Sequence, residues 1–131
     1  MGKVERFEDL EIWSEARRLS KEMITLSKST PLGQNFRLRD QVLASSGSVM
    51  DNIAEGFERN GNKEFRQFLS IAKASAGESR SQLYRVFDYG YISDEELKTL
   101  VNEAENLSKQ ISNFIKYLNK TSFKGSKFQK G

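Results

Sequence analysis

The stretch from Phe65 to Val86, FRQFLSIAKASAGESRSQLYRV, decides the fold class. Its apolar and small residues recur at alternating steps of four and three, which is the spacing of a helix that lies along a partner helix. This spacing predicts a long amphipathic helix over residues 62–89 with one buried stripe. The stripe consists of Phe65, Leu69, Ala72, Ala76, Ser79, Leu83 and Val86.

Three further segments show the same spacing and have well-marked ends. Asp9 is the expected N-cap of the first helix, which ends before Pro31, the only proline of the chain. Ser93 and Glu96 have the spacing of a capping box at the start of the fourth helix, after Gly90. The predicted helices cover residues 9–29, 36–57, 62–89 and 94–119.

Four long helices joined by short loops predict an all-α protein, an up-down-up-down four-helix bundle with antiparallel helices. The bundle is expected to occupy residues 1–118 as one domain. Residues 119–131 are rich in lysine, serine and glycine, and we expect them to form a disordered basic C-terminal tail.

The composition excludes several kinds of chemistry. The chain of 131 residues contains no cysteine and no histidine, which rules out disulfides, thiolate nucleophiles, Cys/His zinc sites and imidazole acid–base catalysis. We therefore expect no metal, no cofactor and no enzymatic activity. Neither a membrane span nor a signal peptide is apparent, so the expected location is cytoplasmic.

The basic character of the chain is concentrated at its C-terminal end. The net charge is +3, but the last 13 residues, NKTSFKGSKFQKG, hold four lysines and no acidic residue. Without them the rest has 17 basic residues (21 minus 4) against 18 acidic ones, a charge near −1. Lysines interleaved with Phe123 and Phe128 are compatible with nucleic-acid binding or simply with solubility.

A second feature is the run of residues 48–65, SVMDNIAEGFERNGNKEF, where polar residues interrupt an apolar helix face. Helical spacing places Asn52, Glu55 and Arg59 on one side. They could fix the register of neighbouring helices, contact another subunit or supply a general base. A lone carboxylate without histidine or metal gives catalysis little support. The predicted helix-contact or assembly residues are Asn52, Glu55, Gly56, Phe57, Glu78, Gln82 and Trp13.

A third feature is a basic stripe on the predicted third helix, where Arg66, Lys73 and Arg80 recur at intervals of seven. Such an array could bind phosphates, or it could be an ordinary solvated face, since acidic residues such as Glu78 lie close by. The candidate nucleic-acid-binding residues are Arg59, Lys63, Arg66, Lys73, Arg80, Lys120, Lys124 and Lys127.

Small residues on the second and third helices predict close packing between them. They are Ala44 to Ser48 on one helix and Ala72, Ser75, Ala76, Gly77 and Ser79 on the other. The aromatic residues exceed what a thin bundle can bury, which favours oligomerisation.

Three motifs resemble the four-helix-bundle proteins encoded by intervening sequences inside bacterial 23S ribosomal RNA genes. They are FEDLEIW at 7–13, SVMDNIAEGFERNGNKEFRQFL at 48–69 and SAGESRSQLY at 75–84, within a similarity that spans residues 5–118. The chain is also similar to the accessory variability determinant of diversity-generating retroelements. Gly61 and Glu58 depart from the family pattern, and the second departure weakens the case for a strongly basic face.

The resemblance implies a ring-like homopentamer without known enzymatic activity. In the retroelement relatives, a basic surface is associated with binding nucleic acid and a reverse transcriptase. The expected function is therefore that of a homo-oligomeric bundle that presents basic residues to RNA, DNA or a reverse transcriptase-like partner. The alternative is a self-assembling protein–protein adaptor without a nucleic-acid role.

Overall fold

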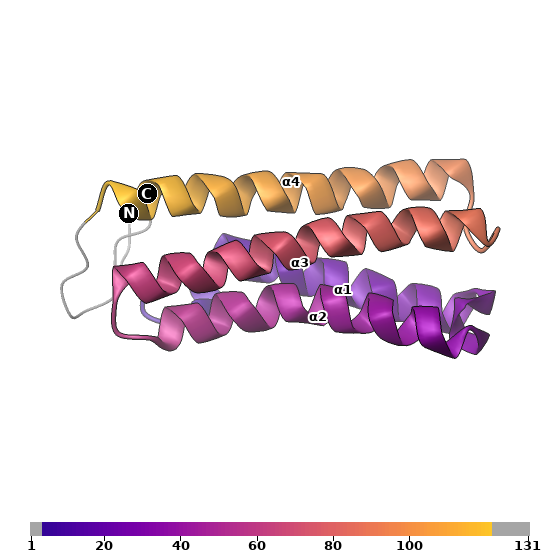
Figure 1. Ribbon diagram of the computed structural model, residues 1–131, viewed down its shortest axis with the longest axis horizontal. Helices are drawn as coiled ribbons and strands as arrows, with labels where there is room; N and C mark the ends of the chain where they lie inside the picture. Colours follow the sequence, from indigo (N-terminus) through magenta and orange to yellow (C-terminus); the bar gives the residue numbers. More distant parts are fainter. Residues whose placement is uncertain (1–3, 122–131) are drawn as a thin grey trace.

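In a computed structural model, which describes residues 4–121, four long helices run up, down, up and down (Figure 1). The predicted all-α bundle is confirmed. The predicted disordered tail falls almost entirely on residues outside the described part of the chain. The helices are α1 (Glu11–Ser29), α2 (Phe36–Glu58), α3 (Asn62–Asp88) and α4 (Asp94–Asn119), with short 3-10 helices η1 (Phe7–Asp9) and η2 (Pro31–Gln34).

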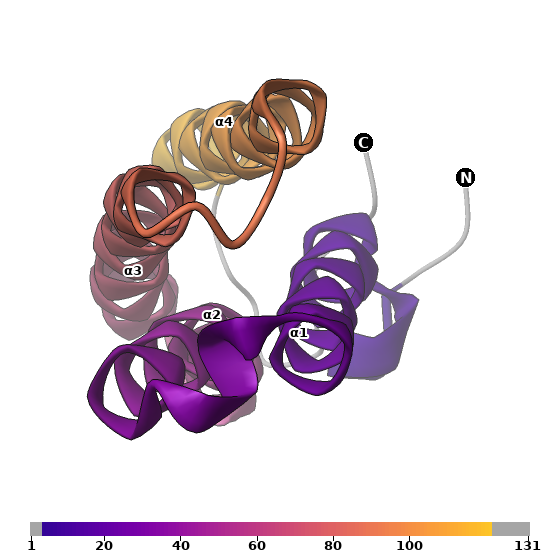
Figure 2. The ribbon, with the colours of Figure 1, turned by 90° about the vertical axis from the view of Figure 1, so that its right-hand side faces the viewer.

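The buried stripe predicted on the third helix forms the centre of the core. All seven of its residues are at most 2% exposed. They pack against the buried faces of the other helices, which follow one another around the bundle in chain order (Figure 2). The heptad spacing therefore identified the correct face of α3.

The ends of the helices follow the predicted signals except at α1. Ser93 Oγ accepts a hydrogen bond from the Glu96 amide at 3.1 Å, and the Glu96 carboxylate accepts one from the Ser93 amide at 2.8 Å. Gly90 leaves α3 with a φ of 80°. The prediction of Asp9 as the N-cap of α1 was wrong. Its carboxylate instead accepts the Arg6 amide hydrogen bond at 3.3 Å, so it closes the η1 turn, and Leu10 is the N-cap of α1.

Helices α2 and α3 approach closely through serines and one glycine. Ser45 Oγ lies 2.8 Å from Ser79 Oγ, and Ser48 Oγ lies 2.9 Å from Ser75 Oγ. Near the end of α2, a Cβ atom on Gly56 would lie only 2.7 Å from the Cβ of Phe68. These contacts support the predicted close packing of the second and third helices.

Three of the small residues do not take part in this packing. Ala44 is exposed, and a Cβ atom on Gly47 or Gly77 would meet nothing within 4 Å. Small size alone could not distinguish these positions from their packed neighbours, because the sequence does not show how close the facing backbone comes.

The seam between α1 and α4 is the most open in the bundle, as Figure 2 shows. It is bridged by Arg18, whose guanidinium lies 3.2 Å from Glu103 on α4 and 3.5 Å from Glu22 on α1. Burial, a hydrogen bond with Glu103 and the charge of Glu103 raise the pKa of Glu22 from 4.5 to about 7, against the opposing effect of Arg18. The seam thus brings two carboxylates together at one guanidinium.

We predict that Gly56→Ala lowers the free energy of unfolding by about 1–3 kcal/mol, because the added methyl group overlaps Phe68 and Phe65. Gly47→Ala is the matched control. It adds the same methyl group on the same helix, where it meets nothing within 4 Å, and should stabilise by up to about 1 kcal/mol through helix propensity. Urea unfolding of both variants measures the difference, and a gain in stability for both would contradict the close approach.

We also predict that Glu22 makes the protein less stable as the pH rises. A pKa raised from 4.5 to about 7 means that the folded state holds this proton more tightly than the unfolded state. Its contribution to stability is therefore fully present below pH 4.5 and is lost as the pH rises through about 7. Glu22→Gln should remove this part of the slope and be more stable than the parent above pH 7.

Urea unfolding at a series of pH values measures this effect. Glu15→Gln is the charge-matched control, since Glu15 also lies beside Arg18, at 3.7 Å, and its loss should leave the slope in place. Identical slopes in Glu22→Gln and the parent protein would show that Glu22 is not responsible.

Candidate nucleic-acid interface

A groove between α3 and α4 brings together part of the predicted basic stripe. It has a volume of about 690 Å³ and contains Lys73 and Arg80, which the heptad spacing had placed on the outer face of α3. Helix α4 forms the opposite wall. The lining residues are Ser70, Lys73, Ala74, Gly77 and Arg80 of α3, with Glu105, Ser108, Lys109, Ser112 and Ile115 of α4.

The groove is positively charged. Lys73, Arg80 and Lys109 supply three cations against the single carboxylate of Glu105, a net charge of +2. Arg80 Nη1 lies 3.0 Å from Glu105 Oε2, and both side chains are more than 40% exposed. Within residues 4–121, neither Lys73 nor Lys109 forms an ion pair. Two lysines are therefore available for an anion, and Arg80 could exchange one carboxylate for a phosphate.

Small and hydroxylated residues give this groove its shape. Ala74 and Gly77 leave the α3 wall low, since a Cβ atom on Gly77 would meet nothing within 4 Å. Ser70, Ser108 and Ser112 add hydroxyl groups along the edges. Hydroxyl donors beside ammonium and guanidinium groups suit the oxygen atoms of a phosphate.

Arg66, the third member of the predicted stripe, has a different position. Its Nη1 donates to Asn119 Oδ1 at 2.6 Å and its Nε donates to Asn62 Oδ1 at 3.0 Å. The Asn62 amide in turn donates to the carbonyls of Leu118 and Thr121, at 2.9 and 3.0 Å. Arg66 therefore helps to hold the end of α4 against the start of α3.

The other candidate basic residues lie outside the groove lining. Arg59 pairs with Glu55 at 3.0 Å, and its guanidinium lies 5.0 Å from the Phe68 ring centre. Lys63 lies in the first turn of α3, and Lys120 is the C-cap of α4. Lys124 and Lys127 fall outside the part of the chain that the structure describes.

The polar residues of the NIAEGF motif do not form one hydrogen-bonded cluster. Asn52 donates to the Ser48 carbonyl at 2.8 Å and to Ser48 Oγ at 2.9 Å, while Glu55 pairs separately with Arg59. Gly56 and Phe57 are buried, and the Phe57 ring packs edge-on against Phe65. Asn52 thereby joins the row of polar contacts between α2 and α3.

The remaining predicted contact residues also have partners within the chain. Gln82 is 5% exposed; its Oε1 accepts a hydrogen bond from Ser45 at 2.6 Å, and its amide donates to Glu78 at 3.3 Å. The Trp13 ring packs edge-on against Phe7, with centres 5.1 Å apart. A role for these residues between subunits stays a prediction.

Sequence reasoning missed the α4 wall of the groove. Glu105, Lys109 and Ser112 follow one another at steps of four and three, on the side of α4 beside its core stripe. This spacing could have been noticed, but it predicts a groove only when α4 is known to lie against α3. Ser70, which lines the same groove from α3, gave no separate signal.

Two other kinds of site are absent from the described residues. Among residues 4–121 there is no group of three or more acidic side chains arranged to hold a metal ion. Within the same range, none of the helices combines the length and apolar character needed to cross a membrane.

The fold defines a protein of the antiparallel four-helix-bundle class. The sequence matches the family described as 23S rRNA-intervening sequence protein over residues 8–113, and the chain belongs to that family. The predicted family resemblance is confirmed. None of the curated proteins matches the chain.

A solved structure supports the same fold. It is the crystal structure of a protein with unknown function from the S23 ribosomal protein family of Bacteroides thetaiotaomicron VPI-5482. The two chains are 24% identical, the match covers 80% of this chain and 98% of the other, and the TM-score is 0.74. At this identity, the similarity concerns the fold alone.

Proposed function

We propose that this protein is a non-enzymatic, cytoplasmic, homo-oligomeric bundle whose α3–α4 groove binds the phosphate backbone of RNA or DNA. A pentamer is the proposed assembly. The observation that carries the proposal is the convergence of Lys73, Arg80 and Lys109 on one groove with three serine hydroxyls. A reverse transcriptase-like protein that handles nucleic acid is the proposed macromolecular partner.

The chemistry of the groove favours a polyanion over a single small anion. The cations lie along two helices, not around one point, so they match a series of phosphates. An oligomer would repeat the groove in each subunit and extend this array. Absence of histidine and cysteine, and the engagement of Glu105 in an ion pair, support a binding role over catalysis.

A self-assembling adaptor is the alternative function, and a separate surface favours it. Phe36 and Tyr89 are 63% and 59% exposed. The Arg39 guanidinium lies 4.8 Å from the Phe36 ring centre, and Tyr89 stacks on Tyr91 with ring centres 5.3 Å apart. Exposed aromatic rings beside arginine are typical of residues that dominate protein–protein binding.

The groove proposal predicts that Lys73→Ala combined with Lys109→Ala weakens nucleic-acid binding and its salt dependence. Removing one phosphate contact should reduce the slope of log K against log salt by about 0.9 for duplex DNA or about 0.7 for single strands. Titrations of fluorescent RNA and DNA from low to physiological salt measure the slope. Glu105→Gln should act in the opposite direction, because it removes the carboxylate that competes for Arg80.

Lys21→Ala combined with Lys28→Ala is the control for this experiment. It removes the same total charge from the exposed surface of α1, away from the groove. Equal weakening by the two double variants would mean that binding follows net charge and not the groove. No salt-sensitive binding by the parent protein would remove the nucleic-acid function and leave the adaptor.

The proposed assembly predicts a mass of about 75 kDa in sedimentation experiments, since five chains of 15.0 kDa form the pentamer. The reason is the exposed aromatic surface described above, which an oligomer would bury. A mass near 15.0 kDa at micromolar concentration would refute the oligomer. Another multiple of the chain mass would refute the pentamer alone.

A further inference from the structure

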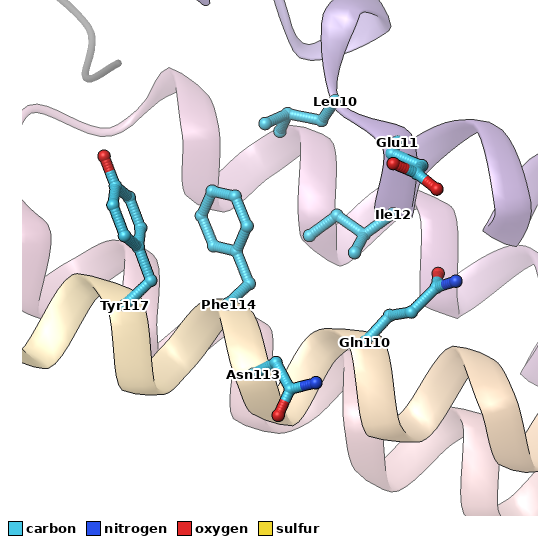
Figure 3. A pocket seen from close by; sticks show the side chains of 7 residues that line it. All are labelled: Leu10, Glu11, Ile12, Gln110, Asn113, Phe114 and Tyr117. Atoms are coloured by element: carbon cyan, nitrogen blue, oxygen red, sulfur yellow. The ribbon is translucent and has the colours of Figure 1, made fainter. Parts of the chain in front are cut away.

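The wider seam of the bundle contains a pocket that the proposed function does not use. It lies between the start of α1 and the last turns of α4 and has a volume of about 290 Å³. Figure 3 shows the rings of Phe114 and Tyr117 projecting from α4 towards Leu10 and Ile12. Its volume is at the lower end of the range for small-ligand pockets, so it suits an aromatic side chain with a short piece of backbone.

The polar lining of this pocket calls for a donor. Gln110 Oε1 is fully buried and has no hydrogen-bond partner among the described residues. A buried acceptor without a donor costs about 1–3 kcal/mol, so a backbone N–H or a lysine brought in by an occupant would stabilise the site. The lining holds one charged residue, Glu11, and no basic one.

The C-terminal segment begins beside this pocket. Helix α4 ends at Asn119, and Tyr117, one of the lining residues, lies only four residues before Thr121. Returning from Thr121 to the level of Phe114 requires about 11 Å along the helix axis. The seven residues from Thr121 to Phe128 can span up to about 25 Å, and Gly125 lies between them to allow a reversal of the chain.

Phe123 does not satisfy the same requirement. It follows Thr121 by two residues, which span at most about 7 Å. Its backbone therefore stops short of the level of Phe114. Of the two phenylalanines beyond the described residues, only Phe128 has the reach for this pocket.

The charges on the two sides are complementary. Phe128 is flanked by Lys127 and Lys130, and residues 122–131 contain no acidic residue. On the protein side, Glu11 lines the pocket and Glu15 lies one turn further along α1. An aromatic residue carried by a basic segment thus matches an aromatic and apolar pocket with an acidic edge.

We propose that residues 122–131 fold back on the same chain and place Phe128 in this pocket, with the adjoining lysines beside Glu11. The segment closes the N-terminal end of the α1–α4 seam. It also occupies lysines that could otherwise add to nucleic-acid binding. This docking does not depend on the α3–α4 groove.

A spin label at Ser126→Cys tests the docking in the full chain. The native chain has no cysteine, so a nitroxide attached there is unique, and the lysines on both sides are retained. Docking predicts that NMR signals of Leu10, Ile12 and the Gln110 side chain lose intensity relative to the reduced label. Signals at the opposite end of the bundle, such as Leu32, should keep theirs.

Two variants of the labelled chain decide which residue anchors the segment. Phe128→Ala should restore the intensities at Leu10, Ile12 and Gln110, whereas the matched Phe123→Ala should leave them low. Unchanged broadening in Phe128→Ala, or none in the labelled parent, would overturn the proposal.

The origin of the segment is tested by mixing two samples. One carries the isotope without the nitroxide, and the other carries the nitroxide without the isotope. Docking within one chain predicts no loss of intensity in the mixture. Broadening at Ile12 in the mixture would show that the segment comes from a neighbouring copy and would refute docking within the same chain.

Discussion

The close approach of α2 and α3 is the constraint on which the rest of the bundle depends. Ser45 and Ser48 meet Ser79 and Ser75 across this interface, and Gly56 lies against the side chains of Phe65 and Phe68. Hydroxyl pairs satisfy each other where larger apolar side chains would hold the helices apart. This contact fixes the face that α3 turns to the core, and with it the opposite face that meets α4. The basic groove follows from that orientation.

The two sides of α4 have different characters as a result. Against α3 it packs closely, with the Arg66–Asn62 hydrogen bonds holding its last turn. Against α1 it leaves an open seam, bridged by Arg18 and two carboxylates that repel each other unless one is protonated. The more tightly packed side carries the candidate phosphate groove. The looser side carries the pocket near the chain end.

The fold could be read from the sequence because periodicity records which face of a helix is buried. The stripe from Phe65 to Val86 and the capping box at Ser93 were both found in the structure. The site was less accessible, since Lys73 and Lys109 lie on different helices and only their packing brings them to one groove. Asp9 shows the same limit locally. An N-cap residue type is recognisable, but the choice between two adjoining turns depends on backbone geometry.

The Asn62 side chain has a consequence for the last turn of α4. The final carbonyls of a helix ordinarily lack partners within the helix, and the turn frays. Here one amide group serves two of these carbonyls, those of Leu118 and Thr121. The point at which the chain leaves the bundle is thereby fixed in position and direction. Whatever follows Thr121 starts from a rigid anchor, which shortens the search for its binding site in the way that a short linker raises effective concentration.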